Sequence, residues 1–196
     1  MRIFVALDID DAIRWRIERF MEGVSEFAPE ARWVRPESLH ITLKFIGEKS
    51  SEAVEEIKRA LSGVPSEPFD VVFRNYGFFP TAPAARVFWV GIEAGPQLSA
   101  LAKLVDDATS ALGIPREAHP YSPHLTLARG VGRSGSPKRD KRDKSNFRFQ
   151  HLQEKLNALP TPEFGTMAAR EFFLYQSELG RGGSRYTKIA KFEISP

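Results

Sequence analysis

Cysteine is absent from this chain of 196 residues. The absence excludes disulfide bonds, thiol catalysis and zinc or iron–sulfur sites that depend on cysteine. The chain also lacks the G-x-S-x-G motif of many serine hydrolases and the G-x-x-x-x-G-K-[ST] loop of nucleotide-activating enzymes. Any chemistry must come from histidine, carboxylate, hydroxyl or cationic side chains, and we expect neither a cofactor nor a metal.

Long hydrophobic segments are missing as well. No apolar run approaches the roughly 18 residues of a membrane span, and the first residues, MRIFVALDIDD, reach acidic side chains without a signal cleavage site. We therefore expect a cytoplasmic protein with no membrane partner. A hydrophobic content of 42% suits one globular domain or two small lobes that share a core.

Positive charge is unevenly distributed, although the net charge is only +3. Residues 131–148 form a basic insertion rich in Gly, Ser and Pro, and it shows no apolar periodicity, which is typical of a flexible loop. Between residues 133 and 148 stand seven basic and two acidic side chains. Two interpretations remain open: a solvated loop without a partner, or a sequence-independent contact with phosphate backbone.

Strands and helices alternate irregularly along the chain. Short apolar runs predict strands at 2–9, 39–47, 69–79, 85–93, 124–132, 167–179 and 185–194, the last two forming a hairpin. Helical spacing predicts helices at 11–28, 51–63, 97–112 and 151–159. Because neighbouring strands outnumber strict strand–helix–strand units, the pattern favours an α+β fold over a doubly wound sheet.

A His-x-Thr-Leu sequence occurs twice, at His40 with Thr42 and again at His124 with Thr126. Random placement of four histidines and seven threonines gives about 0.14 His-x-Thr pairs, so two copies are unexpected. Alternate strand residues share a face, so each motif places an imidazole and a hydroxyl roughly 6.5 Å apart opposite an apolar face. A single copy would more often be a partly buried polar residue; two copies favour a site.

Two imidazoles and two hydroxyls suit displacement at a phosphodiester. Near neutral pH one histidine can act as base and another as acid, while hydroxyls hold non-bridging oxygens. A metal site is disfavoured because the two histidines lack an evident third ligand. The sequence alone does not decide which histidine is the acid.

The motifs and their flanks, RWVRPESLHITLKFIGE, YSPHLTLARG and the N-terminal RIFVALDI, resemble the two-histidine (2H) phosphoesterase superfamily. Within it, the chain is most similar to prokaryotic RNA 2′,3′-cyclic phosphodiesterases, also called 2′-5′ RNA ligases. The resemblance implies a bilobal fold of two pseudo-symmetric sheet-plus-helix lobes with a central cleft. It also implies opening of terminal cyclic phosphates of RNA or cyclic nucleotides to 2′-phosphates, with His40 as general acid and His124 as general base.

Supporting residues follow from strand position. Lys44 continues the face of His40 and Thr42 and is expected to reach the substrate, and Phe45 could stack a base or pack in the core. Arg129 lies on the wrong face by strict alternation but could turn into the cleft at the strand end; the resemblance makes it a phosphate ligand. Two alternatives remain, an RNA-binding module without catalysis and 2′-5′ ligation as the biological direction. We expect a monomer.

Overall fold

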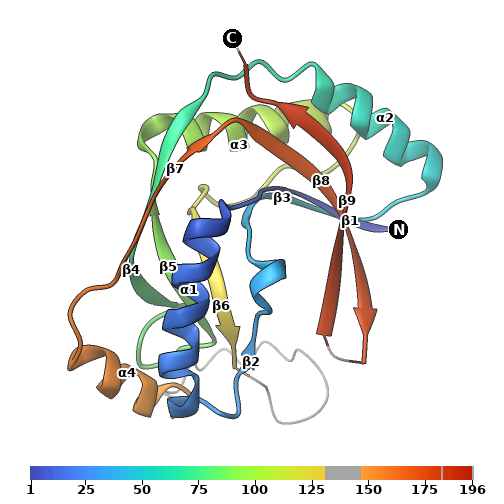
Figure 1. The fold of residues 1–196 in the computed structure, drawn as a ribbon. Helices are drawn as coiled ribbons and strands as arrows, with labels where there is room; N and C mark the ends of the chain where they lie inside the picture. The colour runs from blue at the N-terminus through green and yellow to red at the C-terminus, as the bar shows by residue number, and fades with distance from the viewer. Residues whose placement is uncertain (131–146, 182, 196) are drawn as a thin grey trace.

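Two antiparallel sheets form the framework of the protein (Figure 1). The computed structural model describes residues 1–130, 147–181 and 183–195. Sheet A has the strand order β3 (Ile41–Glu48), β1 (Arg2–Leu7), β8 (Glu171–Gly180) and β9 (Gly183–Glu193). Sheet B has the order β2 (Arg32–Trp33), β6 (His124–Arg129), β5 (Val87–Glu93), β4 (Phe69–Phe79) and β7 (Glu163–Ala169).

Each of the two longest helices packs against the sheet opposite to the one that contains its preceding strand (Figure 1). Helix α1 (Asp11–Val24) follows β1 of sheet A but packs against β7 of sheet B, beside α4 (Gln150–Asn157). Helix α3 (Gly95–Ser110) follows β5 of sheet B but packs against β3 of sheet A, together with α2 (Ser51–Ser62). Two short 3₁₀ turns, Ser25–Phe27 and Pro36–Ser38, complete the N-terminal half.

Helix signals in the sequence explain these elements. Helix α1 buries an apolar stripe at helical spacing, made of Ile13, Ile17, Met21 and Val24. The Ser50 side chain accepts a hydrogen bond from the backbone N–H of Ala53 and caps α2, and Pro96 stands in the first turn of α3. Each helix therefore buries one apolar face against the rest of the protein and turns a polar face to solvent.

One hydrophobic core joins both sheets. Strand residues from sheet A, such as Leu7 and Ile41, belong to the same buried cluster as Val90 and Leu125 of sheet B. A second, smaller cluster lies on the other face of sheet A and contains Phe4, Ala6, Phe173 and Tyr175. The predicted arrangement of two lobes around a shared core is confirmed.

Most predicted elements are present, although the bounds of several differ by a few residues. The predicted strand 167–179 breaks at Arg170: β7 pairs with β4 in sheet B, whereas β8 pairs with β1 in sheet A. The short strand β2 was not predicted, and the first helix ends at Val24. Of the insertion predicted at 131–148, residues 131–146 lie outside the described residues. Within the described chain, no helix is long and apolar enough to cross a membrane.

Candidate active site

His40 stands directly before β3 and is held by its own backbone. Its Nδ1 lies 2.7 Å from the carbonyl oxygen of Ser38, and its Nε2 lies 3.1 Å from Thr42 Oγ1. Because a carbonyl only accepts hydrogen bonds, Nδ1 carries the proton and Nε2 is the titrating atom. The ring packs between Phe4, at a centroid distance of 4.9 Å, and the edge-on ring of Tyr186 at 5.2 Å.

His124, the first residue of β6, repeats this arrangement. Its Nδ1 lies 2.8 Å from the carbonyl oxygen of Ser122, again two residues earlier in the chain. The ring meets Phe79 edge-on at 4.9 Å, and Trp89 lies at 6.5 Å. Thr126, two residues further along β6, is half-buried. Both motifs therefore direct an imidazole Nε2 away from the backbone by the same hydrogen bond.

The two motifs meet where β3 and β6 contact each other. Thr42 and His124 line one cavity of about 380 Å³, and the charge of His124 contributes to the lowered pKa of His40. A second cavity, of about 490 Å³, is lined by Ser38 and Arg129. A third shares Arg129 and Tyr186 with the second and Phe45 with the first. These adjoining cavities form one cleft. His124 lines it directly, and the half-buried His40 contacts three residues that line it, Ser38, Thr42 and Tyr186.

A β-bulge follows the threonine in each motif. In the β1–β3 pairing Thr42 and Lys44 face consecutive residues, so Leu43 is an extra residue. In the β5–β6 pairing Thr126 and Ala128 face consecutive residues, so Leu127 is an extra residue. Each bulge shifts the side-chain alternation by one position.

This shift explains the position of Arg129. Ala128 is fully buried beside Leu127, whereas Arg129 is exposed and lines the cleft. Its positive charge contributes to the lowered pKa of both His40 and His124. Strict alternation had placed Arg129 on the face opposite to His124 and Thr126. The extra residue Leu127 moves Arg129 to the face that lines the cleft. Its role as a phosphate ligand stays a prediction.

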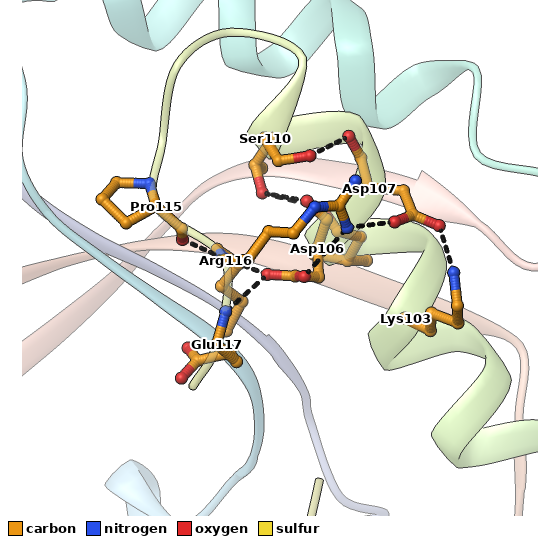
Figure 2. Close-up of polar contacts among 10 residues, drawn as sticks. Lys103, Asp106, Asp107, Ser110, Pro115, Arg116 and Glu117 are labelled. Atoms are coloured by element: carbon orange, nitrogen blue, oxygen red, sulfur yellow. Dashed lines mark hydrogen bonds and ion pairs between the residues drawn. The ribbon is translucent and has the colours of Figure 1, made fainter. Parts of the chain in front are cut away.

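The equivalent shift in β3 contradicts the expected position of Lys44. The Lys44 side chain is 1% exposed, and its ammonium binds the Asp106 carboxylate and, at 2.8 Å, the carbonyl oxygen of Pro115. Asp106 also accepts the backbone N–H of Glu117 and a contact from Arg116, as Figure 2 shows. The Lys44 ammonium is therefore engaged in a structural ion pair and is not available to a substrate.

Phe45 occupies the cleft position that had been expected for Lys44. Its side chain is 59% exposed, lines two of the cavities and lies 5.9 Å from Phe4 between ring centroids. Core packing of Phe45 is therefore excluded. An exposed aromatic ring in a cleft is suited to stacking on a flat ligand.

Both histidines have a pKa below the ordinary value of 6.5. Burial is the largest cause for His40 and for His124, because it disfavours the charged imidazolium. The hydrogen bonds to Ser38 and Ser122 oppose this effect, and the positive charge of Arg129 adds to it. Near pH 7 both imidazoles are therefore neutral in the free protein.

Sequence reasoning missed two contributions to the site. The carbonyl groups of Ser38 and Ser122 orient the histidines, and a backbone acceptor leaves no residue-type signal. Tyr121 donates its hydroxyl to the carbonyl oxygen of Thr42 at 2.9 Å and thus connects the segment before β6 to β3.

No cluster of three or more His, Asp or Glu side chains able to hold a metal occurs among the described residues.

Paired imidazoles with neighbouring hydroxyls and an arginine in one cleft define the class of acid–base phosphoesterases. A family model described as LigT-like phosphoesterase matches the chain twice, over residues 7–89 and 90–186. The chain belongs to the LigT-like phosphoesterase family, and the predicted resemblance is confirmed. The double match agrees with an internal duplication.

Similar proteins match over nearly their whole length. An RNA 2′,3′-cyclic phosphodiesterase of Archaeoglobus fulgidus is 33% identical over 193 residues, which covers 98% of this chain and 100% of that protein. A protein of the same name from Escherichia coli is 27% identical, and the match covers 99% of this chain and 97% of that protein. The crystal structure of E. coli LigT complexed with 3′-AMP has a TM-score of 0.77 and 26% identity, over 100% of this chain and 98% of that chain.

Proposed function

We propose that this protein hydrolyses 2′,3′-cyclic phosphate ends of RNA, and 2′,3′-cyclic nucleotides, to 2′-phosphomonoesters. The observation that carries the proposal is the pair of identically tethered imidazoles, His40 and His124, in one cleft with Arg129. The relatives named RNA 2′,3′-cyclic phosphodiesterase support the choice of substrate. The activity is that of a hydrolase.

His124 is the general base in this mechanism. Its Nε2 accepts a proton from water while the water oxygen forms a bond to phosphorus. His124 is the more open of the two rings: it meets Phe79 at 4.9 Å and Trp89 only at 6.5 Å, whereas His40 is packed among Phe4, Tyr175 and Tyr186. The more accessible ring suits the water molecule.

His40 is the general acid. The bond between phosphorus and the ribose 3′ oxygen breaks, and the Nε2 proton of His40 passes to that oxygen, which leaves a 2′-phosphate and a free 3′-hydroxyl. His124 then returns its proton to solvent, and His40 takes one up. The negative charge of the bound phosphate raises the pKa of His40 and so favours the protonated form that the step requires.

Thr42, Thr126 and Arg129 stabilise the phosphate. The hydroxyls donate to non-bridging oxygens, and the guanidinium pairs with the charge that grows in the transition state. Thr42 Oγ1 lies 3.1 Å from His40 Nε2, which places a donor beside the acid. A binding module without catalysis gains little from this site, because neutral imidazoles attract an anion less than cationic side chains do.

The product of 2′,3′-cyclic AMP hydrolysis tests the proposal. We expect ³¹P NMR to detect adenosine 2′-phosphate, formed at the same rate with and without EDTA, since acid, base and anion donors are all side chains. Adenosine 3′-phosphate as product would reverse the roles of His40 and His124. Loss of activity with the chelator would contradict a mechanism that rests on side chains alone.

A further inference from the structure

A groove lined by arginines leads away from His40. It has a volume of about 490 Å³ and lies between β2, the end of β6 and the turn that joins β8 to β9. We call it the arginine groove; its charged lining residues are Arg32, Arg35, Arg129 and Arg181. Ser38, whose carbonyl orients His40, and Tyr186, which packs on the His40 ring, also line it. The groove is thus continuous with the proposed catalytic centre.

Three of the four arginines in the arginine groove have no balancing charge among the described residues. No carboxylate occurs among its described lining residues. Within the described chain, the guanidinium groups of Arg32, Arg129 and Arg181 have no carboxylate or hydrogen-bond partner. Some arginines elsewhere on the surface are paired with carboxylates, as in Arg74 with Glu93 and Arg116 with Asp107. The groove therefore gathers three exposed guanidinium groups, those of Arg32, Arg129 and Arg181, that have no counter-charge among the described residues.

The strand pairing brings two of these arginines together. Arg32 of β2 lies directly opposite Arg129 of β6, so both side chains leave the same face of sheet B. Like charges in directly opposite positions destabilise a sheet. A bound polyanion would relieve this repulsion, and the planar guanidinium group matches the geometry of a phosphate.

The other side of the cleft has the opposite character. The cavity of about 380 Å³ beyond Thr42 is lined mainly by apolar surface and by the carboxylates of Asp106 and Glu117. Its two lysines, Lys44 and Lys103, are already paired with Asp106 and Asp107. This cavity offers no unpaired lysine to a chain of phosphates, so the arginine groove is the favourable exit from the catalytic centre.

We infer that the arginine groove binds the phosphodiester backbone of the RNA strand that precedes the cyclic phosphate end. The inference rests on the proposed function, because that reaction puts the terminal phosphate between His40 and His124. Arg129 then contacts the reacting phosphate, and Arg32 and Arg181 contact phosphates further along the strand. The protein therefore prefers cyclic-ended oligoribonucleotides to cyclic mononucleotides.

Kinetics on two substrates test the inference with the full chain. The variants are Arg32→Ala and Arg181→Ala; Arg59→Ala, which removes an exposed arginine of α2 outside the groove, is the control. For an oligoribonucleotide with a 2′,3′-cyclic end, each groove variant should lower kcat/KM roughly tenfold, as expected for one lost charge-assisted hydrogen bond. For 2′,3′-cyclic AMP neither groove variant should change kcat/KM. The control variant should leave kcat/KM unchanged for both substrates.

Salt dependence gives a second measurement. The slope of log kcat/KM against log salt for the oligoribonucleotide should become shallower by about 0.7 for each phosphate contact that is lost. Equal losses on both substrates would overturn the inference, because the arginines would then shape the catalytic centre. No loss on either substrate would overturn it as well.

A binding measurement separates this inference from the proposed function. Fluorescence anisotropy with a labelled oligoribonucleotide that ends in a 2′-phosphate needs no turnover. Weaker binding by Arg32→Ala and Arg181→Ala than by Arg59→Ala supports the groove even if the wild-type protein hydrolyses neither substrate. Equal affinity of all variants would contradict the groove, whatever the activity.

Discussion

At the scale of single residues, one hydrogen bond determines the chemistry of each histidine. The contact from Nδ1 to the carbonyl oxygen of Ser38 or Ser122 fixes the tautomer and leaves Nε2 as the only atom that gains and loses a proton. Burial and Arg129 then lower the pKa of both rings. Two residues of the same type, with the same tether, therefore differ mainly in their access to solvent.

Removal of either imidazole tests its proposed role. We expect His40→Ala and His124→Ala each to lower kcat on 2′,3′-cyclic AMP by roughly 10²- to 10⁴-fold, the usual effect of losing an acid or a base. The fold-loss of kcat in the double variant should be far smaller than the product of the two single fold-losses, since the pair acts as a unit. His151→Ala, on the exposed face of α4, is the control. Near-wild-type turnover by either single variant would remove that residue from the mechanism.

The lowered pKa values predict where activity lies on the pH scale. The pH profile of kcat/KM reports the free enzyme, in which one imidazole must be protonated and the other neutral. Since burial and Arg129 lower both values, the bell should be centred below pH 6.5, the ordinary pKa of histidine. The bell for kcat should lie higher, because bound phosphate raises both values.

An Arg129→Ala variant provides an internal check on this pH prediction. Removal of the positive charge should move the centre of the kcat/KM bell upward, whatever happens to its height. Steady-state kinetics between about pH 5 and 8 at constant ionic strength measure both profiles. An unmoved centre would mean that Arg129 does not act on the histidines.

At the scale of secondary structure elements, the paired bulges in β3 and β6 decide which side chains enter the cleft. The alternation in the sequence correctly predicted that His40 and Thr42 share a face, as do His124 and Thr126. It failed at the next residues, because a bulge is set by hydrogen bonding between strands and has no sequence signal here. That is why Lys44 was misplaced.

Other features of the secondary structure likewise fall into those that the sequence predicted and those that it did not. Strong periodicity located the helices and the hairpin of β8 and β9, since local patterns determine them. The break at Arg170 was invisible, because both flanking segments have strand-like sequence and only their pairing partners differ. The arginine groove was also missed, since it joins residues from β2, β6 and the β8–β9 turn.

The ion pair of Lys44 connects β3 to α3, and its removal should affect stability more than catalysis. Lys44→Met leaves the Asp106 carboxylate without its main partner, and we expect the free energy of unfolding to fall by about 3 kcal/mol. Lys103→Met, which removes an exposed pair with Asp107, should lower the free energy of unfolding much less. Urea denaturation measures both variants.

Turnover on 2′,3′-cyclic AMP by the Lys44→Met variant completes this test. We expect a nearly unchanged KM at a temperature where the variant remains folded. A large increase in KM, together with unchanged stability, would restore Lys44 as a substrate ligand and contradict its structural role.

At the scale of the whole molecule, the two halves of the chain are interleaved. The family model matches residues 7–89 and 90–186 separately, yet sheet A combines β1 and β3 with β8 and β9. Sheet B likewise takes strands from both halves, and α1 and α3 each cover the sheet opposite to the one they follow. The duplicated sequence therefore does not correspond to two independent folding units.

This interleaving predicts cooperative unfolding. We expect urea to unfold the protein in one transition, with coincident curves from circular dichroism and tryptophan fluorescence. Fragments 1–89 and 90–196 should each be largely unfolded, since neither contains a complete sheet. A mixture of the two could regain structure by association. A stable fold in one isolated fragment, or two separate transitions, would contradict a single shared core.

Arg170 is the direct connection between the two sheets. It is the one residue between β7 and β8, so a nearly continuous strand runs from sheet B into sheet A, and the Arg170 carbonyl accepts the backbone N–H of Ile194 at 2.7 Å. A connection of a single residue leaves no flexible loop that could act as a hinge between the two sheets. We therefore expect the two sheets to keep a nearly constant spacing, so that a ligand enters and leaves along the cleft while its walls stay in place.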